Sequence, residues 1–422
     1  MWTNPSRDTP HGAVIRPPAR ATVNRVRRTP MELAALATAA VPGLEPVAVG
    51  ASPDDATDFD SALIQGADRR RWRVRSPRGT EASARLETEM LVLRAFGPAI
   101  RAELPFQMPA VAGTVRMGEL TTCVYTHLAG TVRELGELAA GGPRLVKDIG
   151  AALAAIHALP AALVDRADLP AYTANEFRQR RLNELDQAAT TGKIPPVLLR
   201  RWENALEDVS MWRFNPTVVH GDLHEDNLLI DDGRVTAVTG WTDLRVGDPA
   251  DDIAWLVASN EPDFVDAVIA AYHEARKEPV DPHLLRRAAL AAEFALAQYL
   301  VKALALHDVA AAADGEDMLR QLAADIEEQE AEDHAASEAA APTGAPRTAF
   351  PAAEPEAVTS AVPIVQAPSV ERPERETEPE PATDAIPLVS AGDASEEEAA
   401  ASAGAESEGK DSEKEIRSEP TR

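Results

Sequence analysis

The first half of the chain consists mainly of short apolar runs bounded by turn-forming residues. Five of these runs have the length and alternation of β-strands, at residues 47–49, 62–64, 72–74, 115–117 and 122–125. Residues 82–96 instead carry apolar side chains at helical spacing. A further helix is predicted to begin after Thr29, because Thr29 and Glu32 have the spacing of a capping box. The pattern predicts a small antiparallel sheet accompanied by helices.

From residue 145 onward the apolar positions recur mostly at helical spacing. The predicted helices cover residues 145–158, 172–189, 196–211, 249–258, 262–275 and 282–307. Two of them begin at Asp-Pro pairs, Asp248-Pro249 and Asp281-Pro282, which suit the N-cap and the first helical position. Residues 214–246 break the helical pattern. A sheet-rich first part and a helical second part predict an α+β fold with two lobes.

The two ends of the chain lack a pattern that could build a core. Residues 1–28 are broken by prolines and rich in arginine, and residues 331–422 consist largely of Ala, Glu, Pro and Ser. Such segments have too few bulky apolar side chains to offset the entropy of ordering. We therefore predict four segments, namely a disordered basic extension at 1–28, a first lobe at 29–127, a helical lobe at 128–330 and a disordered acidic tail at 331–422.

The charge of the chain excludes some classes of partner. Its 422 residues have a formal net charge of -27, which argues against nucleic-acid binding because phosphate contacts need clustered cations. The single cysteine, Cys123, permits no internal disulfide. The sequence also lacks an uninterrupted apolar run of membrane-spanning length and a secretory signal. We expect a soluble cytoplasmic protein without membrane partners, in which the acidic tail is a candidate segment for binding another protein.

One loop carries the clearest chemical signal. In the segment from His220 to Asn227, an aspartate, Asp222, is followed five positions later by an asparagine and then by an apolar strand. Phosphoryl transfer needs a carboxylate that accepts the proton of a hydroxyl and an oxygen ligand for a magnesium ion on the nucleotide phosphates. Asp222 and Asn227 provide these groups at a suitable spacing. His220 is interpreted as a support for the loop.

This segment resembles the aminoglycoside and macrolide phosphotransferase family, whose catalytic loop reads H-G-D-x-x-x-x-N. A second family element, Gly-Asp-Pro-x-x-Asp-Ile-Ala, is matched by residues 247–254. The resemblance covers about residues 30–325. It implies a two-lobed protein-kinase-like fold, ATP or GTP with magnesium as cofactors, and transfer of a phosphoryl group to a hydroxyl of a small molecule, with Asp222 as the catalytic base.

The resemblance also implies a nucleotide site in the first lobe. Arg75, at the end of the strand at 72–74, is expected to reach the nucleotide phosphates and to pair with Glu89. Other arginines compete for this role, namely Arg70, Arg73 and Arg85. The segment 122–127, which contains Tyr125 and His127, is expected to be the hinge that offers backbone groups to a purine.

Two features depart from the family. The family places a magnesium-binding aspartate directly before an aromatic residue, and here Gly240 precedes Trp241. Asp243 is the nearest carboxylate that could replace it beside Asn227. Residues 54–61, expected to lie over the phosphates, contain four carboxylates, whose negative charge disfavours a triphosphate.

Two functions therefore remain open. The first is an active kinase for a cationic or polyhydroxylated small molecule, and the second is a catalytically impaired relative that binds a nucleotide, metabolite or protein and acts by conformation. A purely structural role of the acidic tail is a third alternative. Candidates for the acceptor site are Tyr172, Asn175, Glu176, Asp252 and Glu293.

Overall fold

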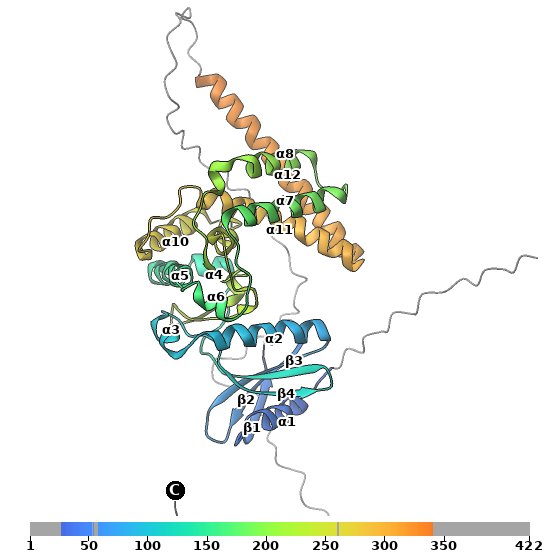
Figure 1. The fold of residues 1–422 in the computed structure, drawn as a ribbon, viewed down its shortest axis with the longest axis vertical. Coiled ribbons are helices and arrows are strands. Elements are labelled where there is room, and N and C mark those ends of the chain that lie inside the picture. The colour runs from blue at the N-terminus through green and yellow to red at the C-terminus, as the bar shows by residue number, and fades with distance from the viewer. Residues whose placement is uncertain (1–26, 53, 55–57, 260, 341–422) are drawn as a thin grey trace, which may run out of the picture.

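The computed structural model describes residues 27–340, except 53, 55–57 and 260, and these residues form two lobes (Figure 1). The smaller lobe holds a twisted antiparallel sheet, and the larger lobe is mostly helical, as predicted. Residues 1–26 and 341–422, which include most of both predicted disordered ends, lie outside the described residues.

The sheet of the small lobe has the strand order β1-β2-β3-β5-β4, with all neighbours antiparallel. The strands are β1 (Pro46–Ala51), β2 (Phe59–Gly66), β3 (Arg71–Pro77), β4 (Val111–Met117) and β5 (Leu120–Thr126). Each lies at one of the five predicted positions and is longer than predicted. Because strand side chains alternate between the two faces, Trp72 and Val74 of β3 pack on one face while Arg73 and Arg75 lie on the other.

Helices cover both faces of this sheet. Helix α1 (Pro30–Ala40) begins with the predicted capping box between Thr29 and Glu32, and its residues Leu33 and Ala37 pack against β2, β3 and β5. Helix α2 (Thr80–Ala95) crosses the opposite face, on the side of the large lobe (Figure 1). A short helix that the pattern did not predict, α3 (Pro98–Glu103), follows it.

The large lobe contains helices, 3₁₀ turns and two short strand pairs. Its helices are α4 (Leu135–Ala139), α5 (Gly142–His157), α6 (Ala162–Arg166), α7 (Ala174–Thr190), α8 (Pro196–Glu207), α9 (Ala254–Val257), α10 (Pro262–Ala275), α11 (Leu284–Leu306) and α12 (Val309–Ala340). The 3₁₀ turns are η1 (Val209–Trp212), η2 (Glu225–Asn227), η3 (Trp241–Asp243) and η4 (Pro249–Asp252). Strands β6 (Thr217–Val219) and β9 (Arg245–Gly247) pair with each other, as do β7 (Leu228–Asp231) and β8 (Arg234–Val238).

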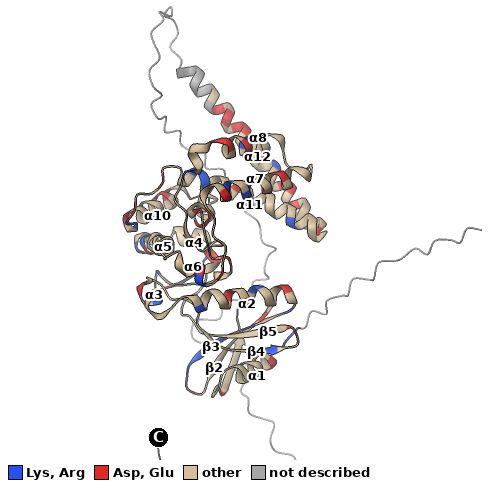
Figure 2. Ribbon diagram, in the orientation of Figure 1, with Lys and Arg blue, Asp and Glu red and all other residues tan. Residues whose placement is uncertain are grey.

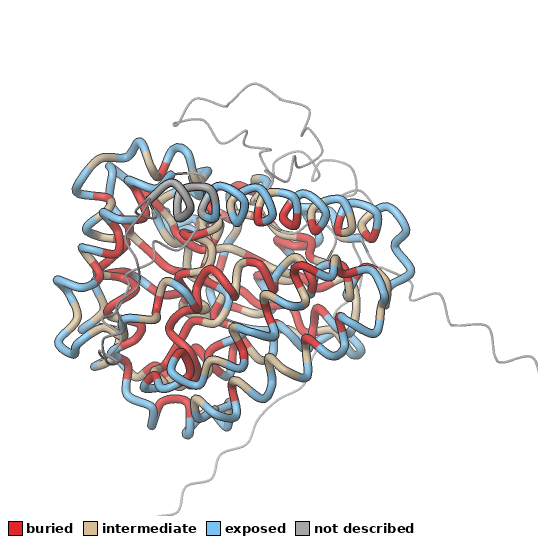
Figure 3. The backbone as a smooth tube through the Cα atoms, turned by 90° about the horizontal axis from the view of Figure 1, so that it is seen from above, coloured by how far each residue is buried: buried red, intermediate tan, exposed pale blue. Residues whose placement is uncertain are grey.

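Buried residues run through both lobes (Figure 3). One apolar cluster joins α2 to α5 and α10, and it includes Trp241, whose ring lies 5.2 Å from that of Phe96. A second cluster joins α7, α8, α11 and α12. Phe96 directly follows α2, and Trp241 lies in η3. The first cluster therefore packs the small lobe against the turn that follows Gly240.

Among the described helices, α11 alone is long and apolar enough to cross a bilayer. Its sequence contains charged residues, and two of these, Arg287 and Glu293, are buried in ion pairs with other helices or loops. The helix packs against α12, α9, η4 and α7. These contacts are those of a core helix.

The boundary predicted at residue 330 differs from the structure. Helix α12 continues ten residues beyond it, to Ala340, and extends away from the lobe (Figure 1). It is held by Leu319, Leu322 and Ile326, which are buried. Residues 327–340 are mostly Ala and Glu, which have high helix propensity, so an already nucleated helix can continue without further packing.

Candidate functional site

The loop from His220 to Asn227 lies between β6 and β7, and its backbone is hydrogen-bonded to the side chain of Asp252. The buried carboxylate of Asp252 accepts hydrogen bonds from the amides of His220, at 2.7 Å, and Gly221, at 2.8 Å. The same carboxylate is 3.2 Å from Nε2 of His157, whose Nδ1 lies 2.8 Å from the hydroxyl of Tyr272. Burial alone would raise the pKa of Asp252, but the hydrogen bond and charge of His157 outweigh it and lower this pKa.

His220 supports the loop, as the sequence predicted. Its buried ring lies 2.9 Å from the carbonyl of Thr239 through Nε2, and Nδ1 accepts the amide of Asp222 at 3.4 Å. This combination fits the neutral ring with the proton on Nε2. Burial lowers the pKa of His220, which also favours the neutral form. His220 therefore fixes the direction of Asp222 and is not placed to exchange protons with solvent.

Asp222 and Asn227 lie together, as predicted. Asp222 has an exposed side chain, and its carbonyl accepts a hydrogen bond from Nδ2 of Asn227 at 2.6 Å. Asn227 is buried, so its amide group is committed to the loop through Nδ2 while Oδ1 keeps its lone pairs for another contact. The carboxylate of Asp222 is thus the accessible group of this loop.

Gly240 occupies a position that a larger residue would not fit without rearrangement. Its backbone is left-handed, with φ of 80°, and a Cβ atom there would lie 2.3 Å from Oδ1 of Asn227. The Asn227 side chain therefore fills the space that a side chain at 240 would need. An aspartate at position 240 is therefore incompatible with the observed placement of the Asn227 side chain.

Asp243 ends the 3₁₀ turn after Gly240 and lies near Asp222. The surrounding protein and the carboxylate of Asp222 raise the pKa of Asp243, although Arg245 partly opposes this. The guanidinium of Arg245 is 3.0 Å from the carbonyl of Asp243 and 3.4 Å from that of Gly221, and it pairs with Asp251 at 2.6 Å. Arg245 thus ties together the two loops that carry the acidic side chains.

In the small lobe, the predicted ion pair between Arg75 and Glu89 is present at 3.3 Å. Arg75 also makes two hydrogen bonds to Asp54, at 2.7 and 3.0 Å, and its guanidinium stacks on the ring of Phe59 at 4.2 Å. Burial alone would lower the pKa of Arg75, but Asp54 and Glu89 raise it, so this side chain stays charged.

The competing arginines have other partners. Arg73 contacts Asp54, Arg85 pairs with Asp58, and Arg70 lies over the ring of Trp72 on the opposite face of the sheet. Of the four arginines considered from the sequence, Arg75 is the one that forms an ion pair with Glu89.

The structure gives Tyr125 and His127 narrower roles than the sequence suggested. The Tyr125 side chain is buried, and its hydroxyl donates to Glu89 at 2.9 Å. Tyr125 therefore helps to position Glu89 in its ion pair with Arg75. The amide of His127 donates to the carbonyl of Arg71, and that of Thr126 to the carbonyl of Ala110. These two amides are used inside the lobe, and their predicted use for a purine would require other backbone groups of the segment.

The candidate acceptor residues are largely engaged elsewhere. Asp252 anchors the catalytic loop, and Glu293 accepts hydrogen bonds from Arg201 and from the indole of Trp202. Glu176 closes the capping box of α7 with Thr173, and the ring of Tyr172 stacks under Arg180. Asn175 is exposed at the start of α7.

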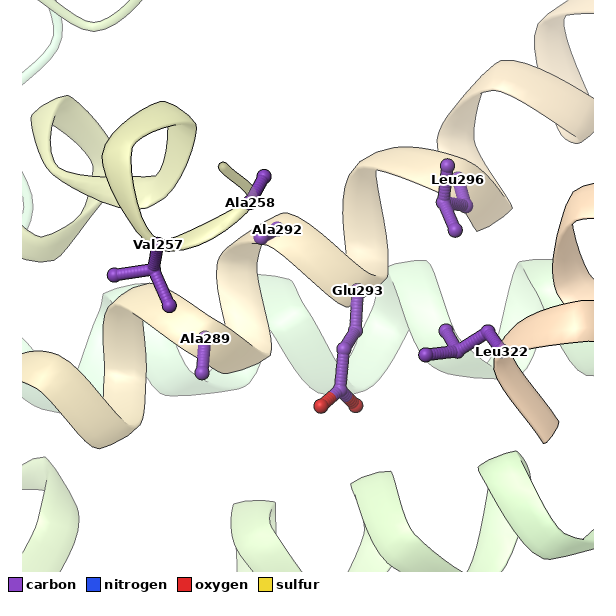
Figure 4. Close-up of a pocket in the computed structure, with 7 residues that line it drawn as sticks. All are labelled: Val257, Ala258, Ala289, Ala292, Glu293, Leu296 and Leu322. Carbon is purple, nitrogen blue, oxygen red and sulfur yellow. The ribbon is translucent and has the colours of Figure 1, made fainter. Parts of the chain in front are cut away.

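A small pocket lies beside Glu293, between α9, α11 and α12 (Figure 4). Its volume is about 20 Å³, which is room for roughly one water molecule. It is lined mostly by alanine, valine and leucine side chains. Both its size and its lining exclude it as a site for a polar acceptor molecule.

Sequence reasoning took His157 as a structural support, and it missed three contributors, namely the contact of Asp54 with Arg75, Arg245, and Tyr272 as the partner of His157. Asp54 was visible only as one of several acids in a loop, and no local pattern links it to Arg75. Arg245 and Tyr272 lie in ordinary strand and helix patterns, so their contacts could not be read from spacing.

Three solved structures that resemble this fold are phosphotransferases. A macrolide 2'-phosphotransferase of Brachybacterium faecium, as apoenzyme, matches with a TM-score of 0.59 and 24% identity over 68% of this chain and 97% of its own. A type I macrolide 2'-phosphotransferase matches with a TM-score of 0.57 and 27% identity over 68% and 96%. The GDP complex of aminoglycoside 2'-phosphotransferase-IIIa matches with a TM-score of 0.59 and 17% identity over 70% and 99%.

Sequence comparison places the chain in one family. The uncharacterized protein YcbJ of Bacillus subtilis is 29% identical over 108 residues, which are 25% of this chain and 35% of that protein. The match thus spans about a third of the length of this curated relative. The profile of the phosphotransferase enzyme family matches residues 49–290, which is more than half of the chain and contains the catalytic loop and the Arg75 ion pair. The chain belongs to the phosphotransferase enzyme family.

Proposed function

We propose that the protein transfers the terminal phosphoryl group of ATP or GTP to a hydroxyl of a small molecule, with Asp222 as the base. The observation that carries this proposal is an exposed Asp222 on a loop whose backbone is fixed by the buried Asp252. In the reaction the acceptor oxygen forms a bond to the terminal phosphorus while the bond to the bridging oxygen breaks. Asp222 takes the hydroxyl proton, and the nucleoside diphosphate leaves.

The residues near Asp222 fit a magnesium ion that arrives with nucleotide phosphates. Asp243 supplies a hard carboxylate oxygen, and Oδ1 of Asn227 is a further oxygen donor. Among the described residues no group of three or more acidic, histidine or cysteine side chains is arranged to hold a metal by itself. Magnesium needs no such group, because phosphates and water complete its coordination. When bound, it would neutralise charge on the phosphates.

The acceptor is proposed to be macrolide-like rather than aminoglycoside-like. A polycationic aminoglycoside needs free carboxylates around the reacting hydroxyl, and the acidic candidates Glu176, Asp252 and Glu293 are committed to the fold. The positively charged Arg245 lies 3.4 Å from the carbonyl of Gly221, beside Asp222. The matched structure with the highest of the quoted identities, 27%, is that of a macrolide phosphotransferase.

The test is a transfer assay with each nucleotide and magnesium, offering a macrolide and an aminoglycoside in parallel. We expect a product of the macrolide that is heavier by one phosphoryl group, and no product with Asp222→Asn, which keeps the shape of the side chain but removes the base. Nucleotide binding by the natural protein without any transfer would instead support the catalytically impaired alternative, which Gly240 favours.

A further inference from the structure

The contacts of Asp54 suggest a control of the proposed nucleotide site. Asp54 lies in the connection between β1 and β2, and its side chain is only 8% exposed. Both of its carboxylate oxygens accept hydrogen bonds from Arg75, and Oδ2 lies 3.3 Å from Nη2 of Arg73. The hydroxyl of Ser61 also donates to it. One carboxylate is thus held by three side chains of the sheet.

These side chains form an anion site that suits phosphate as well as carboxylate. A guanidinium group presents the same planar pair of donors to both kinds of anion. Arg73 and Arg75 are two residues apart in β3, so both side chains lie on the sheet face that is opposite α1. Burial alone would raise the pKa of Asp54, but Arg75 and Arg73 lower it, so an ionised carboxylate fills the site.

The charges show what would follow if Asp54 left. With Asp54 in place, its carboxylate is an anion that both Arg73 and Arg75 contact. If Asp54 left, both guanidinium groups would lose this shared anion, while Arg75 would keep its ion pair with Glu89. Departure of Asp54 therefore creates an attractive site for an anion without leaving Arg75 unpaired.

We propose that Asp54 is an internal competitor of the nucleotide, because its carboxylate occupies a two-arginine phosphate site formed by Arg73 and Arg75. This inference rests on the proposed function and adds to it a second phosphate-binding residue, Arg73, and an intrinsic limit on affinity. The nucleotide binds in competition with Asp54, so its apparent dissociation constant equals the intrinsic one divided by the fraction of time that Asp54 is out of the site.

The experiment measures binding of ATP and GTP by calorimetry for the full chain and four variants. Asp54→Asn keeps the size of the side chain but removes its charge, and we expect affinity to rise by roughly tenfold. Asp68→Asn is the matched control, because Asp68 makes the same charge change at the β2–β3 turn, at the far end of β2 from Ser61. We expect it to bind as the natural protein does. In the Asp54→Asn background, Arg73→Gln should remove most of the gain.

Each other result has a definite meaning. Equal or weaker binding by Asp54→Asn, with Asp68→Asn unchanged, would overturn the competition and show that Asp54 orients Arg75 for the nucleotide, while the proposed function would stand. Failure of all folded proteins to bind either nucleotide would overturn both proposals. Asp54→Ser is a second variant at this position that lacks the carboxylate. Melting temperatures measured without nucleotide verify that each protein is folded.

Discussion

At the scale of single residues, the site depends on side chains that fill one another's space. Asn227 occupies the volume beside Gly240, and its amide holds the carbonyl of Asp222. An aspartate introduced at 240 would have to displace Asn227 and would loosen the loop that carries Asp222. Replacing the glycine alone is therefore a poor way to restore the metal ligand of the family.

This arrangement predicts a large cost for a methyl group at 240. Gly240→Ala should lose roughly 1 to 2 kcal/mol from its left-handed backbone and about 1 to 3 kcal/mol more from the contact with Asn227. Gly233→Ala is the control, because Gly233 has a similar φ of 67° but no atom within 4 Å of its Cβ position. Denaturant unfolding of both variants isolates the second contribution. Equal losses in the two variants would show that Asn227 moves aside at no cost.

The residues of the site could be predicted in part. His220, Asp222 and Asn227 are close in the sequence, so their spacing predicts that they share a loop. Arg75 and Glu89 were paired through the family resemblance, and their ion pair is present. Asp54 could not be assigned to Arg75, because the two residues are 21 positions apart and no local pattern links them. Tyr125 was placed at the hinge, whereas strand alternation turns its side chain towards Glu89.

At the scale of elements, strong local signals predicted the structure well. The capping box at Thr29 and the helical spacing of α5, α7 and α10 correspond to helices in the structure. The predicted helix at 249–258 is instead η4 followed by the short α9. The helix is interrupted after Asp252, the last residue of η4, whose carboxylate accepts a hydrogen bond from the amide of Gly221. The short helices α3, α4 and α6 have too few residues to show a period.

Helix α12 leads to a prediction about truncation. A chain that ends after residue 330 should keep its stability within about 1 kcal/mol, because the side chains of residues 331, 332 and 334 are exposed. A chain that ends after residue 308 loses the buried Leu319, Leu322 and Ile326, at about 1.5 to 3 kcal/mol each. Melting temperatures of the two truncated chains compare these effects. A large loss in the longer chain would mean that the acidic segment packs on the lobes.

At the scale of the whole molecule, the two lobes meet around acidic side chains. Helix α2 packs against η3, so Asp243 lies at the junction of the lobes. Acidic and basic residues are both spread over the two lobes (Figure 2). Burial raises the pKa of Asp243, and repulsion by the carboxylate of Asp222 raises it further. A folded protein that keeps two carboxylates near each other loses some stability, and a cation bound between them would recover it.

This repulsion predicts opposite effects of Asp243→Asn on stability and on magnesium. Because the folded state disfavours the ionised Asp243, the variant should melt at a higher temperature at pH 7, by less than about 1 kcal/mol since the residue is exposed. The gain should shrink as the pH falls through the raised pKa of Asp243 and should be lost below the ordinary Asp pKa of about 4. Nucleotide affinity that rises with magnesium in the natural protein should lose this dependence in the variant. Asp231→Asn, also at an exposed carboxylate, should change neither property, and a lower melting temperature of Asp243→Asn or an unchanged magnesium effect would contradict the assignment of Asp243 as the metal ligand.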